Sequence, residues 1–231
     1  MEPWLIWISC ASLGLAVGCA AVMVADLATG HRQKMWIMNI VWPITALYSG
    51  PLGLWAYFTV GRRSSQAAWH TATKQHQKPP AQEKPLWQAV GVAASHCGAG
   101  CALADIVTAG SLVAVPMTLF GREIFAEWAV SYVLALTIGI AFQYFTIAPM
   151  RNLSVGAGLW AALKADTLSL TAWQVGMYGW MALANFVIFG HELNKGSSVY
   201  WFMMQLAMFA GFVTAYPINW WLVRNGVKER M

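Results

Sequence analysis

Six long apolar stretches dominate the chain, and short polar segments separate them. Each stretch is long enough to form a membrane-spanning helix, which needs about 20 consecutive apolar residues. We therefore predict an all-α integral membrane bundle of about six transmembrane helices. The stretches cover residues 4–26, 36–60, 87–120, 125–148, 156–190 and 198–223.

Composition supports a membrane protein rather than a soluble domain with an anchor. Of the 231 residues, 58% are hydrophobic and 10% are charged, whereas about 25% of the residues of soluble domains are charged. The first stretch, from Trp4 to Ala25, is too long for a signal-peptide core and follows Glu2 rather than a basic segment. We expect it to remain as a transmembrane helix.

The only long polar segment runs from Gly61 to Pro85 and contains the Pro79-Pro80 pair. We interpret it as a flexible linker at about residues 61–86. Residues 1–34 then form the first helix and an outer loop, and residues 35–231 form a five-helix core. Positively charged loops stay in the cytoplasm, so we expect a multi-pass protein of the cell inner membrane with both termini in the cytoplasm. This topology places nine basic residues inside, namely Arg62, Arg63, Lys74, Lys78, Lys84, Arg151, Arg224, Lys228 and Arg230, and four outside, namely Arg32, Lys34, Arg122 and Lys195.

The third stretch contains an unusual group of polar and thiol side chains, from His96 to Asp105. On a helix with about 100° per residue, Cys97, Cys101 and Asp105 share one face with Thr108. His96 lies about 100° away, and it joins this face only if the glycine-rich turn between the two cysteines departs from a regular helix. Two thiols at this spacing favour a soft metal, copper(I) first and zinc second.

The fifth stretch supplies further candidate ligands. Met177 and Met181 lie on one helical face, at a depth similar to that of Cys97 and Cys101. The predicted metal site therefore comprises His96, Cys97, Cys101, Asp105, Met177 and Met181. A purely structural alternative stays open, because buried cysteine behaves as a small apolar residue and methionine commonly fills gaps in a core.

Two acids lie at membrane depth, Asp105 and Asp166. An ionisable group there costs a few kcal/mol at least, so it normally faces a bundle interior or a wet cavity. Both carboxyl groups are therefore candidates for a transport or relay role.

Several motifs together resemble a bacterial membrane family described as domain of unknown function 4396. The resemblance implies a multi-spanning architecture and brings no established reaction with it. Some relatives are attached to copper-protein modules, which favours copper by analogy alone. The motifs are Met38-Asn39-Ile40-Val41-Trp42-Pro43, Tyr48-Ser49-Gly50-Pro51-Leu52-Gly53, His96-Cys97-Gly98-Ala99-Gly100-Cys101, Ala148-Pro149-Met150-Arg151, Lys164-Ala165-Asp166-Thr167-Leu168-Ser169 and Tyr216-Pro217-Ile218-Asn219-Trp220-Trp221.

Three functions stay open. The first is binding or handling of copper, with the lipid bilayer, the metal ion and a periplasmic copper protein as partners. The second is a proton- or ion-coupled transporter or channel for a small solute that uses Asp105 and Asp166. The third is a non-catalytic assembly subunit of a membrane complex. An enzyme is less favoured because no cofactor or hydrolase motif occurs, and no aromatic and basic groove for nucleic acid is evident.

Overall fold

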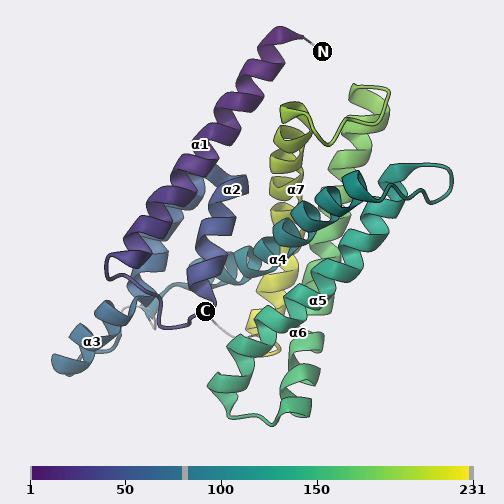
Figure 1. Ribbon diagram of the computed structural model, residues 1–231. Helices are drawn as coiled ribbons and strands as arrows, with labels where there is room; N and C mark the ends of the chain where they lie inside the picture. The colour runs from purple at the N-terminus through teal and green to yellow at the C-terminus, as the bar shows by residue number, and fades with distance from the viewer. Residues whose placement is uncertain (1, 80–82, 229–231) are drawn as a thin grey trace.

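The chain folds into long helices, several of which are tilted against one another (Figure 1). This computed structural model describes residues 2–79 and 83–228, without the side chains of residues 149–151. Pro80 and Arg230, used in the topology prediction, lie outside the described residues, and the side chain of Arg151 is among those not described. The α-helices are α1 (Pro3–Ala28), α2 (Met38–Ala56), α3 (Gln66–Lys74), α4 (Leu86–Ala114), α5 (Glu123–Arg151), α6 (Val155–Ala182) and α7 (Ser198–Arg224).

Four helices in the described part of the chain are long and apolar enough to cross a membrane: α1, α4, α5 as far as Ala148, and α7. Helix α6 has a similar length, 28 residues, but carries the buried Asp166. Large apolar side chains stay exposed along the sides of the bundle, as expected for surfaces that face lipid. Examples with at least half of their surface exposed are Leu15, Val107, Val133, Val175 and Val213. The prediction of an all-α protein is thus confirmed for the described residues, and four of the helices are long and apolar enough to cross a membrane.

The second predicted span is not one straight helix. Helix α2 bends sharply at Gly50, whose φ of 52° and ψ of −128° are not helical. Glycine adopts such a positive φ without the steric penalty that a Cβ atom causes. The chain continues through a π-helical turn, η1 (Tyr57–Gly61), and a short 3₁₀ turn, η2 (Arg62–Ser64). Residues 32–66 therefore form a helical hairpin, here called the Gly50 hairpin.

Contacts between the two arms of the Gly50 hairpin establish that the chain returns to its starting level. Gln33 pairs with Ser65 in an antiparallel bridge, and the backbone N–H of Gln66 donates to the carbonyl of Arg32 at 2.7 Å. Farther along, the rings of Trp42 and Tyr57 lie 5.6 Å apart, edge to face. The prediction that Arg32 and Lys34 lie at the opposite end from the linker is therefore wrong.

The tip of the Gly50 hairpin inserts among the long helices. The carbonyl of Leu47 accepts a hydrogen bond from Nε2 of Gln205 in α7 at 2.8 Å. The ring of Tyr48 packs 6.1 Å from that of Trp173 in α6. A carbonyl freed at the break in α2 thus finds a partner inside the protein, which a broken helix in an apolar environment requires.

The described part of the predicted linker, residues 61–79 and 83–86, is more ordered than a flexible segment. It contains α3, whose first turn is capped by the Ser65 hydroxyl, which accepts from the N–H of Ala68 at 3.2 Å. The ammonium of Lys34 lies 3.1 Å above the centre of the Trp69 ring. The Lys84 amine donates to the Ser64 hydroxyl at 2.7 Å, and burial, with Arg63 nearby, lowers its pKa to about 8.

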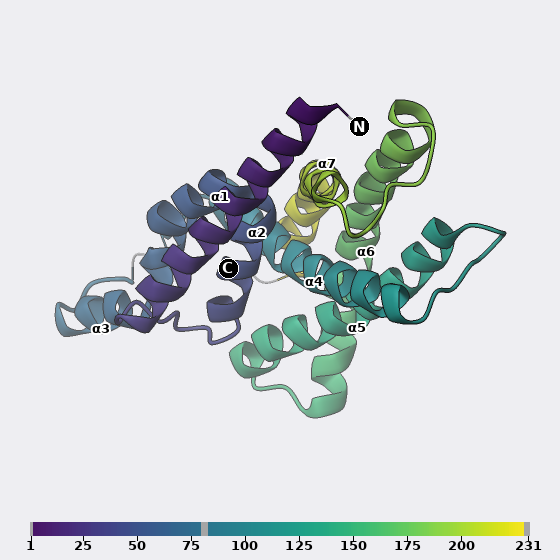
Figure 2. The ribbon, with the colours of Figure 1, turned by 45° about the horizontal axis from the view of Figure 1, so that its top comes forward.

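The two ends of the bundle are distinct in Figures 1 and 2. One end, here called the N-terminal end, carries the chain N-terminus and the loops that follow α4 and η4 (Leu183–Ile188). The opposite end, here called the linker end, carries α3 and the connection between α5 and α6. Helix α4 crosses the bundle obliquely between α2, α5 and α7.

Helices α4 and α6 approach closely at Gly98. A Cβ atom there would lie 2.6 Å from the Tyr48 hydroxyl and would also collide with the ring of Trp173. Gly98→Ala is therefore expected to lower the free energy of unfolding by about 1–3 kcal/mol, because a filled core resists overpacking. Gly91 in the same helix has open space around it, so Gly91→Ala is the matched control. It should leave stability unchanged or raise it by up to about 1 kcal/mol. Denaturation of both variants in detergent measures the difference, and equal stability of the two would contradict this packing.

Candidate functional site

Helix α4 carries the predicted polar stripe into the centre of the bundle. Cys97 and Cys101 are fully buried, and Asp105 and Thr108 are 3% and 1% exposed. The helix is continuous from Leu86 to Ala114, so it does not unwind at the glycine-rich turn. Cys97, Cys101 and Asp105 therefore share one face with Thr108, as the sequence predicts. His96 stays about 100° away from that face. Its ring packs edge-on against Phe142 of α5, with the ring centres 5.7 Å apart.

Cys97 lies at the centre of a buried polar group. Its thiol donates to Oδ1 of Asp166 at 2.9 Å and lies 3.1 Å from the Ser169 hydroxyl. The Lys228 amine, which follows α7, donates to the Cys97 sulfur at 3.0 Å. The same amine donates to Oδ1 of Asn219 at 2.9 Å and forms an ion pair with Asp166 at 3.8 Å.

These five side chains, here called the lysine cluster, come from four separate segments: Cys97 from α4, Asp166 and Ser169 from α6, Asn219 from α7 and Lys228 from the residues after α7. Asn219 closes the network by donating to the Ser169 hydroxyl at 2.7 Å. Each member is at most 1% exposed. A buried ion pair with this many hydrogen bonds offsets much of the cost of removing its charges from water.

Gly139 of α5 makes room for the acid of the lysine cluster. A Cβ atom at this position would collide with Oδ2 of Asp166. That oxygen is buried and accepts no hydrogen bond from any described residue. One carboxylate oxygen is thus fully engaged, and the other keeps unused acceptor capacity.

Sequence reasoning identified Cys97 and Asp166 but missed Ser169, Asn219 and Lys228. Ser169 had a signal, since it lies three residues after Asp166 and therefore on the same helical side. Asn219 had another, because an amide inside an apolar span normally has a partner. Lys228 had no signal in the apolar pattern, since it follows the last helix.

A second polar element lies one turn farther along α4. The Gln174 amide of α6 approaches the Cys101 sulfur at 3.8 Å. Asp105 follows, and its Oδ1 accepts a hydrogen bond from the Ser131 hydroxyl of α5. Its other oxygen is buried and without a hydrogen-bond partner among the described residues. The polar face of α4 thus continues from Cys97 through Cys101 to Asp105.

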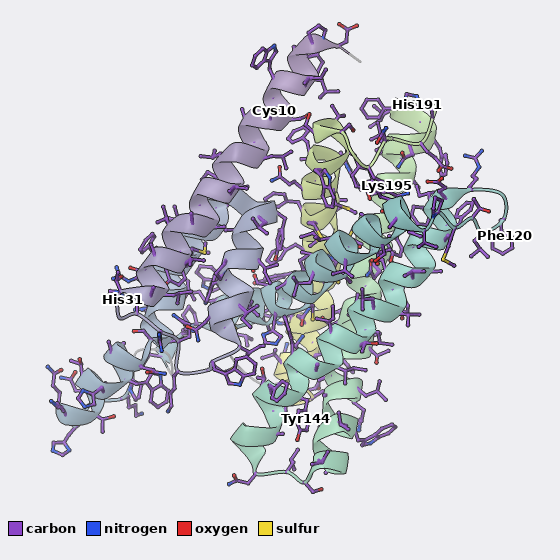
Figure 3. All side chains as sticks on the ribbon, viewed as in Figure 1. Cys10, His31, Phe120, Tyr144, His191 and Lys195 are labelled. Carbon is purple, nitrogen blue, oxygen red and sulfur yellow. The ribbon has the colours of Figure 1, made fainter. Side chains whose placement is uncertain are left out.

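Asp105 also lines a cavity of about 640 Å³ toward the N-terminal end of the bundle. Here Lys195 forms ion pairs with Glu127 at 3.6 Å and with Glu123 at 3.2 Å, and the Tyr200 hydroxyl donates to Glu127. Figure 3 labels Lys195, beside the loop that precedes α7. We call this space the polar cavity. Its ionisable acid and base side chains are Asp105, Glu123, Glu127, Glu192, Arg122 and Lys195.

A smaller, apolar pocket of about 170 Å³ is also lined by Asp105. It lies between α1, the Gly50 hairpin and α7, and Tyr48 and Gln205 are among its lining residues. Asp105 therefore lines both the polar cavity and this apolar pocket.

The predicted metal ligands do not assemble into one site. Cys97 is occupied by Asp166 and Lys228, and Asp105 belongs to the polar cavity. Met181 also lines that cavity, whereas Met177 is fully buried in the shared core. Within the described residues, no group of three or more His, Cys, Asp or Glu side chains converges as metal ligands would. A metal that used both cysteines would first have to displace the Lys228 amine, and the copper hypothesis stays a prediction.

Comparison with known proteins gives one match. No curated protein and no solved structure matches the chain. A family model described as "Domain of unknown function (DUF4396)" matches residues 86–228. The matched region begins at α4 and ends at Lys228, so it contains the whole lysine cluster and leaves out α1, the Gly50 hairpin and α3. It covers more than half of the chain, which therefore belongs to this family of unknown function.

Proposed function

We propose that this protein moves a small cation across the cell inner membrane as a multi-pass transporter or channel. One observation carries the proposal: buried polar side chains continue from the polar cavity through the bundle to the lysine cluster. The series runs from Asp105 to Cys101 with Gln174, and then to Cys97 with Asp166. Polar and ionisable groups are costly at membrane depth and normally mark ion or substrate pathways.

The proposed orientation places the linker end in the cytoplasm. Because the Gly50 hairpin returns to its starting level, Arg32 and Lys34 join the basic residues of the linker. Of the basic residues that were predicted outside, Arg122 and Lys195 then remain there. This arrangement strengthens the positive-inside bias beyond that of a six-helix topology. It gives five crossings, by α1, α4, α5, α6 and α7, with the N-terminus outside and the C-terminus in the cytoplasm.

The Gly50 hairpin supports transport over a purely structural role. Irregular backbone at membrane depth is tolerated where it is buried in protein or lines a water-filled cavity, and channels and transporters use it in this way. The hairpin tip contacts α7 through Leu47 and α6 through Tyr48. It thus packs beside the section of α4 that carries the two cysteines.

The charges of the polar cavity favour a cation. Four acids and two bases line it, so its formal charge is −2 when all six are ionised. A cleft with walls of low dielectric constant concentrates ions of the opposite sign. Asp105 at the end of this cavity then receives the cation, and Asp166 provides the next negative group.

A soft monovalent cation such as copper(I) is a second candidate for the cargo, and zinc is a weaker one. The observation that favours copper(I) is the placement of both thiols along the polar series, together with Met181 and Met204 in the wall of the polar cavity. Thiolate and thioether sulfur bind copper(I) well. A periplasmic copper protein would then be the partner that delivers the ion. The other alternative is a non-catalytic assembly subunit, and measured cation transport by the purified protein would exclude a purely structural role.

Uptake into proteoliposomes tests the proposal. Purified protein is reconstituted and offered protons, sodium, potassium, methylammonium, zinc and, under reducing conditions, copper(I). Asp105→Asn is expected to lower the uptake rate at least tenfold, since the amide keeps the shape and removes the charge that receives the cation. Glu83→Gln, at an exposed acid outside the polar series, is the matched control and should transport normally.

The cysteine variants identify the cargo class. Joint replacement of Cys97 and Cys101 by serine should abolish transport of copper(I) and leave transport of a hard cation measurable. Absence of protein-dependent flux for every cation in the series would contradict a transport function.

A further inference from the structure

The Lys228 amine lies among acceptor groups from three different helices. It lies 3.0 Å from the Cys97 sulfur, 2.9 Å from Oδ1 of Asn219 and 3.8 Å from Oδ1 of Asp166. The side chain is completely buried. The ligands come from three helices, and only the lysine comes from outside them.

A tight turn after α7 brings Lys228 to this position. Gly226 has a φ of 69°, a left-handed conformation that commonly ends a helix. The chain then reverses, and the backbone N–H groups of Val227 and Lys228 both donate to the carbonyl of Leu222, at 3.0 and 3.2 Å. The side chain of Lys228 therefore points back along α7 toward Asn219. Because this turn lies beyond the last helix, the lysine can leave without the loss of any helical residue.

The side chains that surround the Lys228 amine have the chemistry of a cation site. Asp166 contributes one negative charge, the oxygens of Asn219 and Ser169 are acceptors, and the sulfur of Cys97 accepts from the Lys228 amine. Oδ2 of Asp166 is buried without a hydrogen-bond partner among the described residues. One negative charge with neutral acceptors suits a monovalent cation or a primary ammonium group better than a divalent ion.

We propose that Cys97, Asp166, Ser169 and Asn219 form a binding site for a small monovalent cation or primary ammonium, and that Lys228 is its tethered resting occupant. The inference rests on the proposed transport function, since it makes the turn after α7 the closure at the cytoplasmic end of the path. A cation that arrives from Asp105 displaces the Lys228 amine, and return of the amine releases the cation.

Chemical rescue in detergent tests the site without any transport measurement. Lys228→Ala removes the three distal carbons and the amine of the lysine, and propylammonium replaces the same atoms. We expect propylammonium chloride to raise the Tm of this variant in a saturable manner, by about 5 °C or more, because a ligand that binds the folded state stabilises it. Wild-type protein should respond by less than about 1 °C at the same concentration.

Controls separate binding from general solvent effects. 1-Propanol has the same chain length without the charge, and it should not stabilise Lys228→Ala. Lys164→Ala removes an exposed lysine two residues from Asp166, and propylammonium should not affect it. Lys228→Gln, whose amide still reaches toward Asn219, provides a second variant if Lys228→Ala does not purify, and methylammonium is then the probe. The proposal is overturned if the Tm of the variant that purifies does not rise in a saturable manner with its probe.

The outcomes distinguish this site from the proposed function. If Lys228→Ala binds propylammonium and the wild type carries no cation in proteoliposomes, the site stands and the transport function fails. If the wild type transports and Lys228→Ala neither binds propylammonium nor changes the rate, transport stands and the tethered occupant is excluded. Closure by Lys228 predicts that passive cation leak through Lys228→Ala exceeds that of the wild type at least threefold.

Discussion

Lys228→Met is expected to lower the free energy of unfolding by about 3–5 kcal/mol, and Asp166→Asn by a smaller amount, about 1–2 kcal/mol. Both substitutions break the same ion pair, but the groups that they strand differ. Asp166 lies inside α6 and is fully buried, so its carboxylate has no route to water. Lys228 follows α7 and is held by a short turn, so its amine can swing out into solvent once its partner is neutral.

Denaturation with a graded series of detergent mixtures measures both changes. Lys164→Met is the matched control, since Lys164 is exposed in the same region of α6 and should change stability by no more than about 0.5 kcal/mol. The double variant Asp166→Asn, Lys228→Met removes both charges, and we expect it to be more stable than Lys228→Met alone. Two outcomes would contradict a buried ion pair between Asp166 and Lys228. One is an equal loss of unfolding free energy in the two single variants, and the other is a loss in the double variant that equals the sum of the single losses.

Much of the fold follows from the apolar pattern because a helix must be long and apolar to cross a bilayer. The predicted spans of residues 4–26 and 125–148 correspond closely to α1 (Pro3–Ala28) and to α5 (Glu123–Arg151). The third stretch forms a helix only as far as Ala114 and runs obliquely as α4, and the fifth changes to the π-helical turn η4 at Leu183.

The Gly50 hairpin is a feature that average hydropathy along the chain does not detect. The first arm of the Gly50 hairpin, residues 38–49, and the second arm, residues 51–61 with η1 included, each have at most about 18 Å of helix, which is too short to cross a hydrocarbon core of about 30 Å. Two such arms have the same summed length and composition as one full span, so an average over the stretch does not separate them. The local signal was the Ser49-Gly50-Pro51 sequence in the middle of the run, since glycine and proline there permit a reversal.

The candidate site was predictable only in part for a related reason. Asp105, Asp166 and the cysteines stood out because their chemistry is unusual inside apolar stretches. Lys228 lies in a polar segment, where a lysine is ordinary, and it therefore counted only as a topology signal. Its role depends on the reversal at Gly226 and on the meeting of α4, α6 and α7 at Cys97, which no periodicity along a single helix encodes.

Labelling of single cysteines is expected to place Thr29 and Gln75 on the same side of the membrane. Both are exposed, and they flank the Gly50 hairpin, one before it and one after it. A hairpin that enters and leaves at the linker end keeps them together, whereas a full crossing by residues 36–60 separates them. In a Cys10→Ser background, Thr29→Cys and Gln75→Cys should react from the same side with a membrane-impermeant maleimide. Cys19, Cys97 and Cys101 are buried and should remain unlabelled in the folded protein.

Two reference positions convert this comparison into a complete topology. Ser154→Cys, in the connection between α5 and α6, should label with Thr29→Cys and Gln75→Cys, because all three lie at the linker end. Thr118→Cys, in the loop after α4, should label from the opposite side. Opposite accessibility of positions 29 and 75 would instead require residues 36–60 to cross the bilayer, and it would remove both the hairpin and the five-crossing orientation. Agreement of positions 29, 75 and 154 would leave an odd number of crossings, with Lys228 in the cytoplasm and the polar cavity open to the outside.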